Sequence, residues 1–389
     1  MSKSLRVLQL VQKPQRRGAE IFATQLAGVL QGLGHHTMSA YLYPYTGEGG
    51  LSLGPDDMIL GGRENHPLET LVGCHPGLLW RLARTVGAFR PDVVQVNGAR
   101  TVKYGAFLAS LTPGRRWRLV YRNIGDPKEW IGNDARRAFY GHVVMPRIDG
   151  VVSVSEANLE ELQTMYGFDI PAVHLPRAVD VEGFVPSRTR AEVRAAAGTP
   201  PDAPVLLYVG SLTQEKRPDR LLRVAQLVRE RIPSAVLWIV GDGPLRPTFE
   251  ASVSSHGMAD AVRLLGVSAD VPDYMHAADV LVLTSDTEGT PGVVLEAGAA
   301  RLPVVAPRVG GLASCVIDGM TGLLADAGDE LGLALSIIGL LDDPARRDSM
   351  GEAARGWVSR RFSLPSVARQ YVDFYSQLCG RVAAGVPGA

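Results

Sequence analysis

Two carboxylate side chains, Glu288 and Glu296, lie eight positions apart on either side of a loop that contains Gly and Pro. An apolar run over residues 279–285 leads straight into this loop and predicts a buried strand before it. Glu288 would lie on the loop, and Glu296 about two turns into the helix that follows. Because ionised carboxylates accept hydrogen bonds from hydroxyl groups, this spacing favours a ligand with hydroxyl groups at two separate places.

The same loop carries the signals of a helix start. Thr290 is a good N-cap residue, and Pro291 suits the first helical position. The first N–H groups of a helix have no partner inside it, so an anion binds there readily. Those groups would belong to Gly292, Val293 and Val294. A phosphate between two sets of hydroxyl groups is the chemistry of a nucleotide sugar, which we therefore expect as the ligand.

A second group of candidate binding residues follows the buried strand predicted over residues 204–209. The segment begins at Gly210 and includes Ser211, Lys216 and Arg217. Positive charge at this point could neutralise a pyrophosphate leaving group. A Lys–Arg pair on a loop is more often simply solvated. Its place at a strand end favours the functional interpretation, for Lys216 more than for Arg217.

Glycine or serine stands at the ends of successive predicted strands in the second half of the chain. Ligands of open parallel sheets bind beyond the carboxyl ends of the strands, and glycine there allows a close approach. A tight turn explains each glycine alone, whereas four at successive strand ends favour a shared cleft. The residues are Gly210, Gly241, Gly243, Gly266 and Ser285.

The composition is typical of a globular protein with more than one domain. The chain has 389 residues, of which 46% are hydrophobic and 21% charged. Lys plus Arg and Asp plus Glu each total 40, so no net charge attracts nucleic acid. The three cysteines have neither disulfide-framework nor zinc spacing. With no signal-peptide pattern and no apolar run long enough to span a bilayer, we expect a cytoplasmic protein.

Short apolar runs alternate with helical patterns along the chain, which predicts an α/β fold with parallel sheets. Residues 44–75 read as a long surface excursion, and residues 129–148 as a helix. The expected parts are a Rossmann-like domain over 1–180, a linker region over 181–203, a second Rossmann-like domain over 204–363 and a crossover helix over 364–380. The expected strands are 5–11, 37–43, 92–96, 118–122 and 150–154, then 204–209, 235–240, 262–265, 279–283, 303–306 and 322–324.

Together these segments resemble the retaining glycosyltransferases of family 4, which have the GT-B fold. That fold has two Rossmann-like domains facing a central cleft and a C-terminal helix that crosses back to the first domain. The resemblance covers nearly the whole chain and rests most on Glu288-x7-Glu296. The other segments that carry it are Gly210 to Lys216, Gly241-Asp242-Gly243-Pro244-Leu245-Arg246, Leu265-Gly266, Val271-Pro272-Asp273-Tyr274, Pro303-Val304-Val305-Ala306, Gly310-Gly311 and Val316 to Leu324.

The resemblance implies roles for the residues around the paired carboxylates. Glu296 would hold the ribose hydroxyls of the donor. Glu288 would lie near the transferred sugar and take part in catalysis. Lys216 would contact the diphosphate. The diphosphate or sugar would also touch the backbone of Gly292, Val293 and Val294.

The base of the donor would stack near Leu265–Val267, which includes Gly266 and Val267, and near the turn from Gly241 to Gly243. The family often has Arg where this chain has Ser211, so one phosphate contact is missing or moved, with Arg217 as the candidate replacement. No metal and no cofactor beyond the donor substrate are implied, because cationic side chains and a helix terminus take the place of a metal.

The first domain matches the family less closely. Its Gly-Gly-x-Glu-like turn reads Arg17-Gly18-Ala19-Glu20, and Gly18 could bring a helix end to the phosphate or the acceptor. An ordinary strand-to-helix turn is an equal alternative. Asn97 and Asn123 stand where the family commonly has histidines. Asn123 is the catalytic candidate and Asn97 an acceptor-side candidate. Asp126 is the nearest ionisable residue, although an Asp before Pro more often forms a turn.

The implied activity is that of a retaining, metal-independent glycosyltransferase of the hexosyltransferase class, acting on a nucleotide sugar and an acceptor hydroxyl. The leaving phosphate would take the acceptor proton, so the missing histidines are compatible with activity. A sugar-nucleotide-binding protein without turnover and a sugar-nucleotide epimerase remain alternatives. A dinucleotide-dependent oxidoreductase is disfavoured, because Gly-x-Gly-x-x-Gly is absent from the expected positions. The sequence names neither the donor base, the sugar nor the acceptor.

Basic and aromatic residues mix around Trp80 and Trp117 in the first domain. One interpretation is peripheral contact with an anionic membrane. The favoured alternative is that both tryptophans belong to the core and the arginines are solvated.

Overall fold

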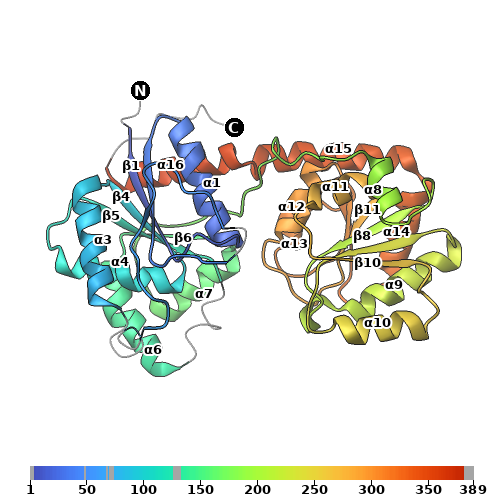
Figure 1. The fold of residues 1–389 in the computed structure, drawn as a ribbon, viewed down its shortest axis with the longest axis horizontal. Helices are drawn as coiled ribbons and strands as arrows, with labels where there is room; N and C mark the ends of the chain where they lie inside the picture. Colours follow the sequence, from blue (N-terminus) through green and yellow to red (C-terminus); the bar gives the residue numbers. More distant parts are fainter. Residues whose placement is uncertain (1–3, 48–49, 67–68, 70–73, 126–132, 381–389) are drawn as a thin grey trace. The chain divides into compact units, whose positions relative to one another are not determined.

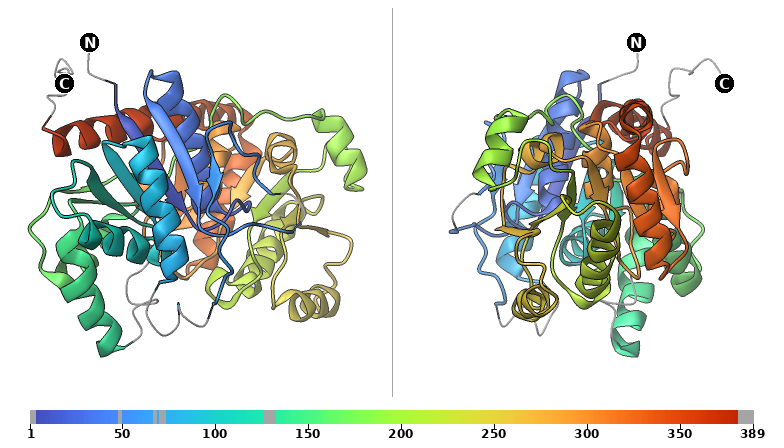
Figure 2. Two further views of the ribbon diagram at one scale, coloured as in Figure 1. Left: turned by 60° about the vertical axis from the view of Figure 1, so that its left-hand side comes forward. Right: turned by 90° about the vertical axis from the view of Figure 1, so that its right-hand side faces the viewer.

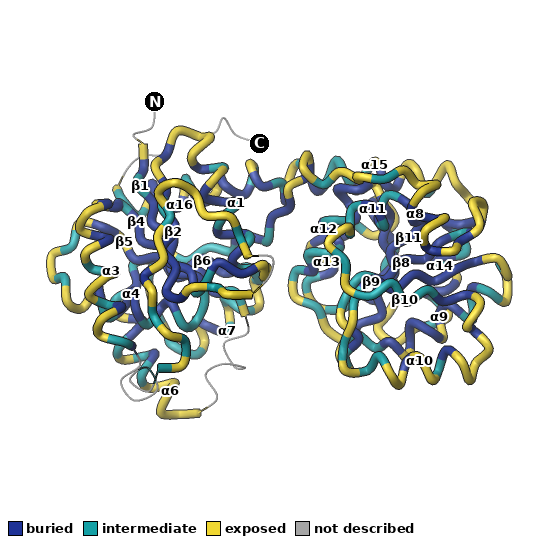
Figure 3. The backbone as a smooth tube through the Cα atoms, in the orientation of Figure 1, coloured by how far each residue is buried: buried dark blue, intermediate teal, exposed yellow. Residues whose placement is uncertain are grey.

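The computed structural model describes residues 4–47, 50–66, 69, 74–125 and 133–380. The chain divides into two compact α/β units (Figure 1). The first takes residues up to Arg177 and those from Leu364 onward, and the second is Ala178–Ser363. In each unit the central strands are buried and the helices expose their outer faces (Figure 3).

The first unit contains a seven-stranded parallel sheet in the order β3-β2-β1-β4-β5-β6-β7. Leu8 and Leu10 on β1 belong to a core with residues of α3 and α4, whereas Gln9 faces the other way. The strands are β1 (Arg6–Val11), β2 (His36–Tyr41), β3 (Met58–Ile59), β4 (Val93–Asn97), β5 (Arg118–Asn123), β6 (Gly150–Ser153) and β7 (Ala172–His174). The helices named in the text are α1 (Gly18–Gly32), α3 (Pro76–Phe89), α4 (Ala99–Leu111), α6 (Asp134–Phe139), α7 (Glu156–Tyr166) and α16 (Leu364–Leu378).

The C-terminal helix α16 is part of the first unit, as expected from the resemblance, and packs beside α1 (Figure 2). Its hydroxyl groups reach the sheet. The Tyr375 hydroxyl donates to Oε1 of Gln95 at 2.5 Å, and Nε of Arg122 donates to the Tyr371 hydroxyl at 3.1 Å. The polar side chains on this face of the sheet are therefore bonded to the last helix of the chain.

The second unit contains a six-stranded parallel sheet in the order β10-β9-β8-β11-β12-β13. Alternate strand residues enter two cores, with Leu207 and Trp238 on one face and Leu206 and Leu237 on the other. The strands are β8 (Val205–Val209), β9 (Val236–Val240), β10 (Val262–Gly266), β11 (Val280–Val282), β12 (Val304–Pro307) and β13 (Gly322–Ala325). The helices are α8 (Arg190–Ala196), α9 (Pro218–Arg231), α10 (Arg246–Ser255), α11 (Val271–Ala277), α12 (Gly292–Ala299), α13 (Leu312–Cys315), α14 (Glu330–Asp342) and α15 (Pro344–Arg361).

In both sheets the strand order reverses beside the first strand of the unit, between β1 and β4 and between β8 and β11. This is the doubly wound arrangement, whose ligands bind outside the carboxyl ends of the strands at the reversal. The expectation of two Rossmann-like units is thus confirmed. By the same rule, a ligand of the second unit should lie outside the carboxyl ends of β8 and β11.

Three expected segments differ in the structure. Residues 181–203 belong to the second unit, where α8 begins with a Thr189–Glu192 capping box and buries Arg194. The described part of 44–75 contains the edge strand β3. The helix expected over 129–148 is described from residue 133 as α6, a π-helical turn (Tyr140–Val144) and a 3-10 turn (Met145–Arg147).

Candidate active site

The loops after β8 and β11 meet at the strand-order reversal of the second unit, because these strands are parallel neighbours. After β8, residues Gln214–Lys216 form one 3-10 turn before α9. The hydroxyl of Thr284, which follows β11, donates to the carbonyl of Lys216 at 3.0 Å, and the N–H of Asp286 donates to the carbonyl of Glu215 at 2.9 Å. The two loops are therefore fastened together.

Lys216 and Glu288 form an ion pair at this place. Nζ of Lys216 lies 2.8 Å from both carboxylate oxygens of Glu288, and the Ser285 hydroxyl donates to Oε1 at 2.6 Å. The Glu288 side chain is 7% exposed and that of Lys216 is 25% exposed. Burial, together with the nearby carboxylate of Glu288, raises the pKa of Tyr208, whose protonated hydroxyl donates to the Ser211 carbonyl at 2.9 Å. A half-buried ammonium group thus lies beside a carboxylate that can also accept hydrogen bonds from hydroxyl groups.

Arg217 pairs with carboxylates other than Glu288. Its backbone is left-handed, with φ 51°, at the N-cap of α9. Its guanidinium donates to Asp219 at 2.8 Å and to Asp286 at 3.2 Å. Hydrogen bonds from Arg217 lower the pKa of both carboxyl groups. The structure therefore places Arg217 in a surface charge network.

Helix α12 begins one residue later than expected. Pro291, with ψ 115°, is extended and takes the N-cap position, so the assignment of Thr290 as N-cap was wrong. The N–H of Val294 donates to the Pro291 carbonyl at 3.1 Å, which removes it from the groups expected to face a ligand. Gly292 and Val293 are half-buried in the first turn, and Glu296 is half-buried further along the helix.

The strand-end glycines are needed where the loops touch one another. A Cβ on Gly241 would lie 2.0 Å from the Gly210 carbonyl oxygen, and one on Gly243 would lie 2.4 Å from that of Leu212. A Cβ on Gly310 would lie 1.9 Å from the Glu288 carbonyl oxygen. The tight-turn interpretation therefore accounts for these three glycines, and the one at Gly310 packs against the backbone of Glu288.

The other two residues expected near the base of a donor, Gly266 and Val267, lie at the end of β10. Gly266 has φ 72° and its carbonyl accepts the N–H of Gly241 at 2.8 Å. Val267 next to it is 81% exposed, which is unusual for a valine and leaves an apolar surface at the end of β10.

Gly18 is the first residue of α1, as the strand-to-helix turn predicted. A Cβ at Gly18 would lie 3.5 Å from a guanidinium nitrogen of Arg177. The Arg177 guanidinium thus lies close to the positive N-terminal end of α1, where a Cβ at Gly18 would be in ordinary van der Waals contact with it.

Asn97 and Asn123 lie on opposite faces of the first sheet, because the register pairs Asn97 with Arg122. Asn97 is 7% exposed and donates to Oε1 of Gln9 at 3.0 Å and to the Leu10 carbonyl at 3.2 Å. Asn123 is fully buried and accepts from the Tyr121 hydroxyl at 3.1 Å, while its Nδ2 has no hydrogen-bond partner among the described residues. The structure does not bring the two side chains together. Asp126 lies outside the described residues.

Two sequence families cover most of the chain. Residues 16–182 match Glycosyltransferase Family 4, and residues 189–357 match the family described as Glycosyl transferases group 1. A GDP-mannose-dependent alpha-(1-6)-phosphatidylinositol monomannoside mannosyltransferase from Mycolicibacterium smegmatis is 31% identical over 75% of this chain and 78% of its own length. The chain belongs to glycosyltransferase family 4.

Other relatives of this glycosyltransferase match a shorter part. The D-inositol 3-phosphate glycosyltransferase of Kineococcus radiotolerans is 39% identical over 59% of this chain and 59% of its own length. The crystal structure of Anabaena HepE in complex with UDP and glucose covers 96% of this chain and 100% of its own, with TM-score 0.75 and 19% identity. That likeness identifies the GT-B fold.

Sequence reasoning missed several polar residues of this glycosyltransferase. Ser285 was noted only as a small strand-end residue, and Arg177 had no motif around it. At the carboxyl ends of β1 and β4, Lys13 and Arg100 each lie 3.0 Å from Glu64. Within the described ranges, no three His, Cys, Asp or Glu side chains gather closely enough to hold a metal ion. No described helix is long and apolar enough to cross a membrane.

Proposed function

We propose that this glycosyltransferase moves a hexosyl group from a nucleoside-diphosphate sugar to an acceptor hydroxyl, with retention of configuration and without a bound metal. The observation that carries the proposal is the ion pair of Lys216 and Glu288 at the strand-order reversal, beside the first turn of α12.

Binding of the donor would separate Lys216 from Glu288 and give each of them a new partner. Lys216, 25% exposed, can turn its ammonium from Glu288 to a phosphate oxygen. Glu288 would then accept hydrogen bonds from hydroxyl groups of the sugar, with Ser285 still donating to it. The first turn of α12 at Gly292 and Val293 would add backbone N–H groups, and Glu296 would accept from the ribose hydroxyls.

In the proposed transfer, the bond between the anomeric carbon and the phosphate oxygen breaks, and a bond to the acceptor oxygen forms on the same face. The acceptor proton moves to the leaving phosphate. Negative charge grows on the diphosphate, and Lys216 and the helix end stabilise it, which is the task that a metal performs elsewhere. In the first unit, Nδ2 of Asn123 would donate a hydrogen bond to a hydroxyl group of a substrate.

The names of relatives support a donor and an acceptor class to assay first. The mannosyltransferase from Mycolicibacterium smegmatis is named as GDP-mannose-dependent, and HepE was crystallised with UDP-glucose. Both named bacterial relatives act on inositol-containing acceptors by name. We therefore propose a phosphorylated inositol derivative as the first acceptor to test.

The deciding experiment measures binding and turnover separately. A panel of UDP-, GDP-, ADP- and TDP-sugars is screened by thermal shift, since a ligand raises the stability of the state that it binds. The stabilising donor is then incubated with and without acceptor, and the anomeric configuration of the product is read by NMR. Product only with acceptor supports transfer, isomerised donor without acceptor supports an epimerase, and binding without product supports a binding protein.

Peripheral membrane contact is proposed for one of the two tryptophans that basic residues surround in the first unit. Trp80 on α3 is 59% exposed and lies under the Arg84 guanidinium at 4.9 Å, whereas Trp117 is 7% exposed and belongs to the core. Trp80 would enter the membrane interface, with Arg84 attracting anionic headgroups. Co-sedimentation with phosphatidylglycerol vesicles at low salt should fall in Trp80→Ala; no binding by the unchanged protein would refute the contact.

A further inference from the structure

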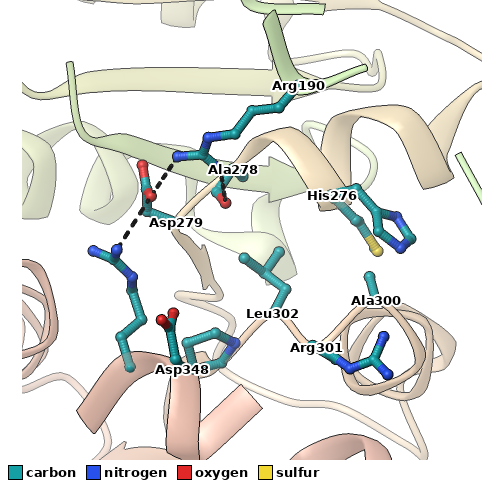
Figure 4. Close-up of a pocket in the computed structure, with 11 residues that line it drawn as sticks. Arg190, His276, Ala278, Asp279, Ala300, Arg301, Leu302 and Asp348 are labelled. Carbon is teal, nitrogen blue, oxygen red and sulfur yellow. Dashed lines mark hydrogen bonds and ion pairs between the residues drawn. The ribbon is translucent and has the colours of Figure 1, made fainter. Parts of the chain in front are cut away.

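A hollow lies at the amino ends of strands β11 and β12, at the edge of the sheet opposite to Lys216 and Glu288. Its volume is about 360 Å³ (Figure 4). Ala278 and Asp279 precede β11, and Leu302 and Pro303 precede β12, so strand ends form its floor. The remaining walls come from α8, α11, the end of α12 and α15, and are lined by Arg190, Met275, His276, Ala300, Arg301, Arg347 and Asp348.

Asp279 is the centre of the charge in this hollow. Its side chain is 7% exposed. The carboxylate accepts hydrogen bonds from the buried Arg194 guanidinium at 2.8 Å and from the N–H of Val205 at 2.8 Å. Arg190 also donates to it, at 2.7 Å, and the Arg347 guanidinium lies 3.9 Å away. Three guanidinium groups thus surround one carboxylate, which leaves two positive charges in excess at this carboxylate.

Other groups offset this excess only in part. Asp348 lines the hollow but is exposed to solvent, and Arg301 is paired with Glu352 outside the lining. The positive surroundings act on the innermost guanidinium: burial, and then repulsion by Arg190, lowers the pKa of Arg194. A negatively charged ligand would relieve this repulsion.

The two outer arginines can serve a ligand without exposing Asp279. Arg347 is 3.9 Å from the carboxylate, beyond hydrogen-bond distance, so it can turn without losing a bond. Arg190 is 45% exposed, and Arg194 keeps Asp279 paired if Arg190 turns too. Guanidinium groups bind phosphate oxygens in pairs of parallel hydrogen bonds, which makes phosphate the matching anion.

The size and the lining indicate more than a bare phosphate. The volume is at the lower end of the ~300–1,000 Å³ typical of small-molecule sites. In Figure 4, Arg190 and Asp279 lie on one side of the hollow, Arg301 and Ala300 on the other, and Leu302 between them. The apolar surface of Leu302 and Ala300 suits the carbon skeleton of a small organic phosphate.

We propose that this hollow binds a small phosphate monoester, with Arg190 and Arg347 holding the phosphate and Leu302 contacting the organic body. The site lies within the second unit and is separate from the proposed donor site. The proposal does not depend on the proposed donor.

Isothermal titration calorimetry on the full chain tests it, with glycerol 3-phosphate, glucose 6-phosphate and 3-phosphoglycerate as probes. Inorganic phosphate and glucose are the comparison ligands. At least one monoester should bind, and glucose should not. Arg347→Ala should weaken that binding at least about tenfold, with the double variant Arg190→Ala/Arg347→Ala weaker still. Inorganic phosphate binding as tightly as every monoester would overturn the assignment of an organic body.

Two further variants show whether a loss of affinity is specific to this hollow. Arg229→Ala removes an arginine of the same unit with similar exposure, 23% against 21% for Arg347, and should leave the affinity unchanged. Lys216→Ala disables the proposed donor site and should also leave it unchanged. Failure of all three monoesters to bind, or an equal loss in Arg229→Ala or Lys216→Ala, would refute the site. If Arg347→Ala does not fold by circular dichroism, Arg347→Gln is measured instead.

Discussion

The ammonium group of Lys216 lies 2.8 Å from both carboxylate oxygens of Glu288, although 72 positions separate the two residues in the chain. The parallel pairing of β8 and β11 brings their loops together at the strand-order reversal. Each charge therefore already has a partner of opposite sign, and in the proposed function a diphosphate sugar would replace both partners.

Lys216→Ala should weaken donor binding by at least tenfold, which corresponds to about 1.4 kcal/mol. It should also lower kcat, because growing charge on the leaving diphosphate loses its cation. Arg217→Ala is the matched control, since Arg217 is held by Asp219 and Asp286, and its effect should be smaller. Calorimetric donor titration together with initial rates measures both. Equal losses in the two variants would contradict the assignment.

Lys216→Ala should also lower the free energy of unfolding by about 1–3 kcal/mol, because it leaves the nearly buried Glu288 carboxylate without its cation. Adding Glu288→Gln should recover most of that loss, while donor binding stays weak. Urea denaturation of the single and double variants forms a double-mutant cycle. Additive effects on stability would show that the pair is not coupled.

Glu296→Ala should weaken binding of the nucleoside diphosphate by about 1–3 kcal/mol, through loss of the hydrogen bonds to the ribose hydroxyls. A 2′-deoxy nucleotide should bind the unchanged protein more weakly than the ribonucleotide, and the two should bind Glu296→Ala alike. Retention of the full preference for ribose in the variant would place the ribose elsewhere.

Gly310→Ala should displace the loop that carries Glu288, because the new Cβ would lie 1.9 Å from the Glu288 carbonyl oxygen at a backbone φ of 49°. Both the melting temperature and donor affinity should fall. Gly339→Ala in α14 has no atom within 4 Å of the new Cβ and should be neutral or raise stability by about 0.5–1 kcal/mol. A Gly310→Ala variant with unchanged donor affinity would argue against the role of this loop.

The carboxyl group of Asp273 should make the free energy of unfolding depend on pH in the acid range. Burial alone would raise its pKa, but hydrogen bonds from Arg188 at 2.7 Å and from Ser187 outweigh burial and lower it. The pKa of Asp273 is therefore lower in the folded protein than in the unfolded chain, where it is about 3.9. The ionised carboxylate stabilises the fold above a pH of about 3.9, and this stabilisation is lost as the pH falls through the folded-state pKa.

Asp273→Asn should therefore be less stable than the unchanged protein by about 1–3 kcal/mol near neutral pH. The difference should shrink as the pH is lowered below about 3.9. Denaturant unfolding across this range measures it, with Asp260→Asn, whose side chain is 70% exposed, as the control with little effect. A difference that stays constant down to acid pH would assign the loss to packing instead.

The strands, loops and helices that carry the proposed donor site could be predicted because their information is local in the sequence. The apolar run before Glu288, the glycines after each strand and the spacing to Glu296 all lie within single loops and helices. The error at Thr290 was one residue, and it arose because Thr and Pro both suit a helix start.

The proposed acceptor-side residues and the hollow around Asp279 depend on contacts between distant segments. Asn97 and Asn123 fall on opposite faces because of strand register, which a single sequence does not reveal. The short edge strands β3 and β7 exist through pairing with their neighbours. Arg190, Asp279 and Arg347 come from three separate segments, and nothing local to any of them predicts that they meet.

The position of α16 in the chain sets the order in which the two units can complete their folding on the ribosome. Residues 178–363 are continuous and include every strand of the second sheet, so that unit can fold as soon as it has emerged. The first unit begins earlier but needs the last helix of the chain. Until Tyr371 and Tyr375 leave the ribosome, Arg122 and Gln95 lack the hydroxyl groups that they contact in the finished fold. The unit translated first is therefore the unit completed last.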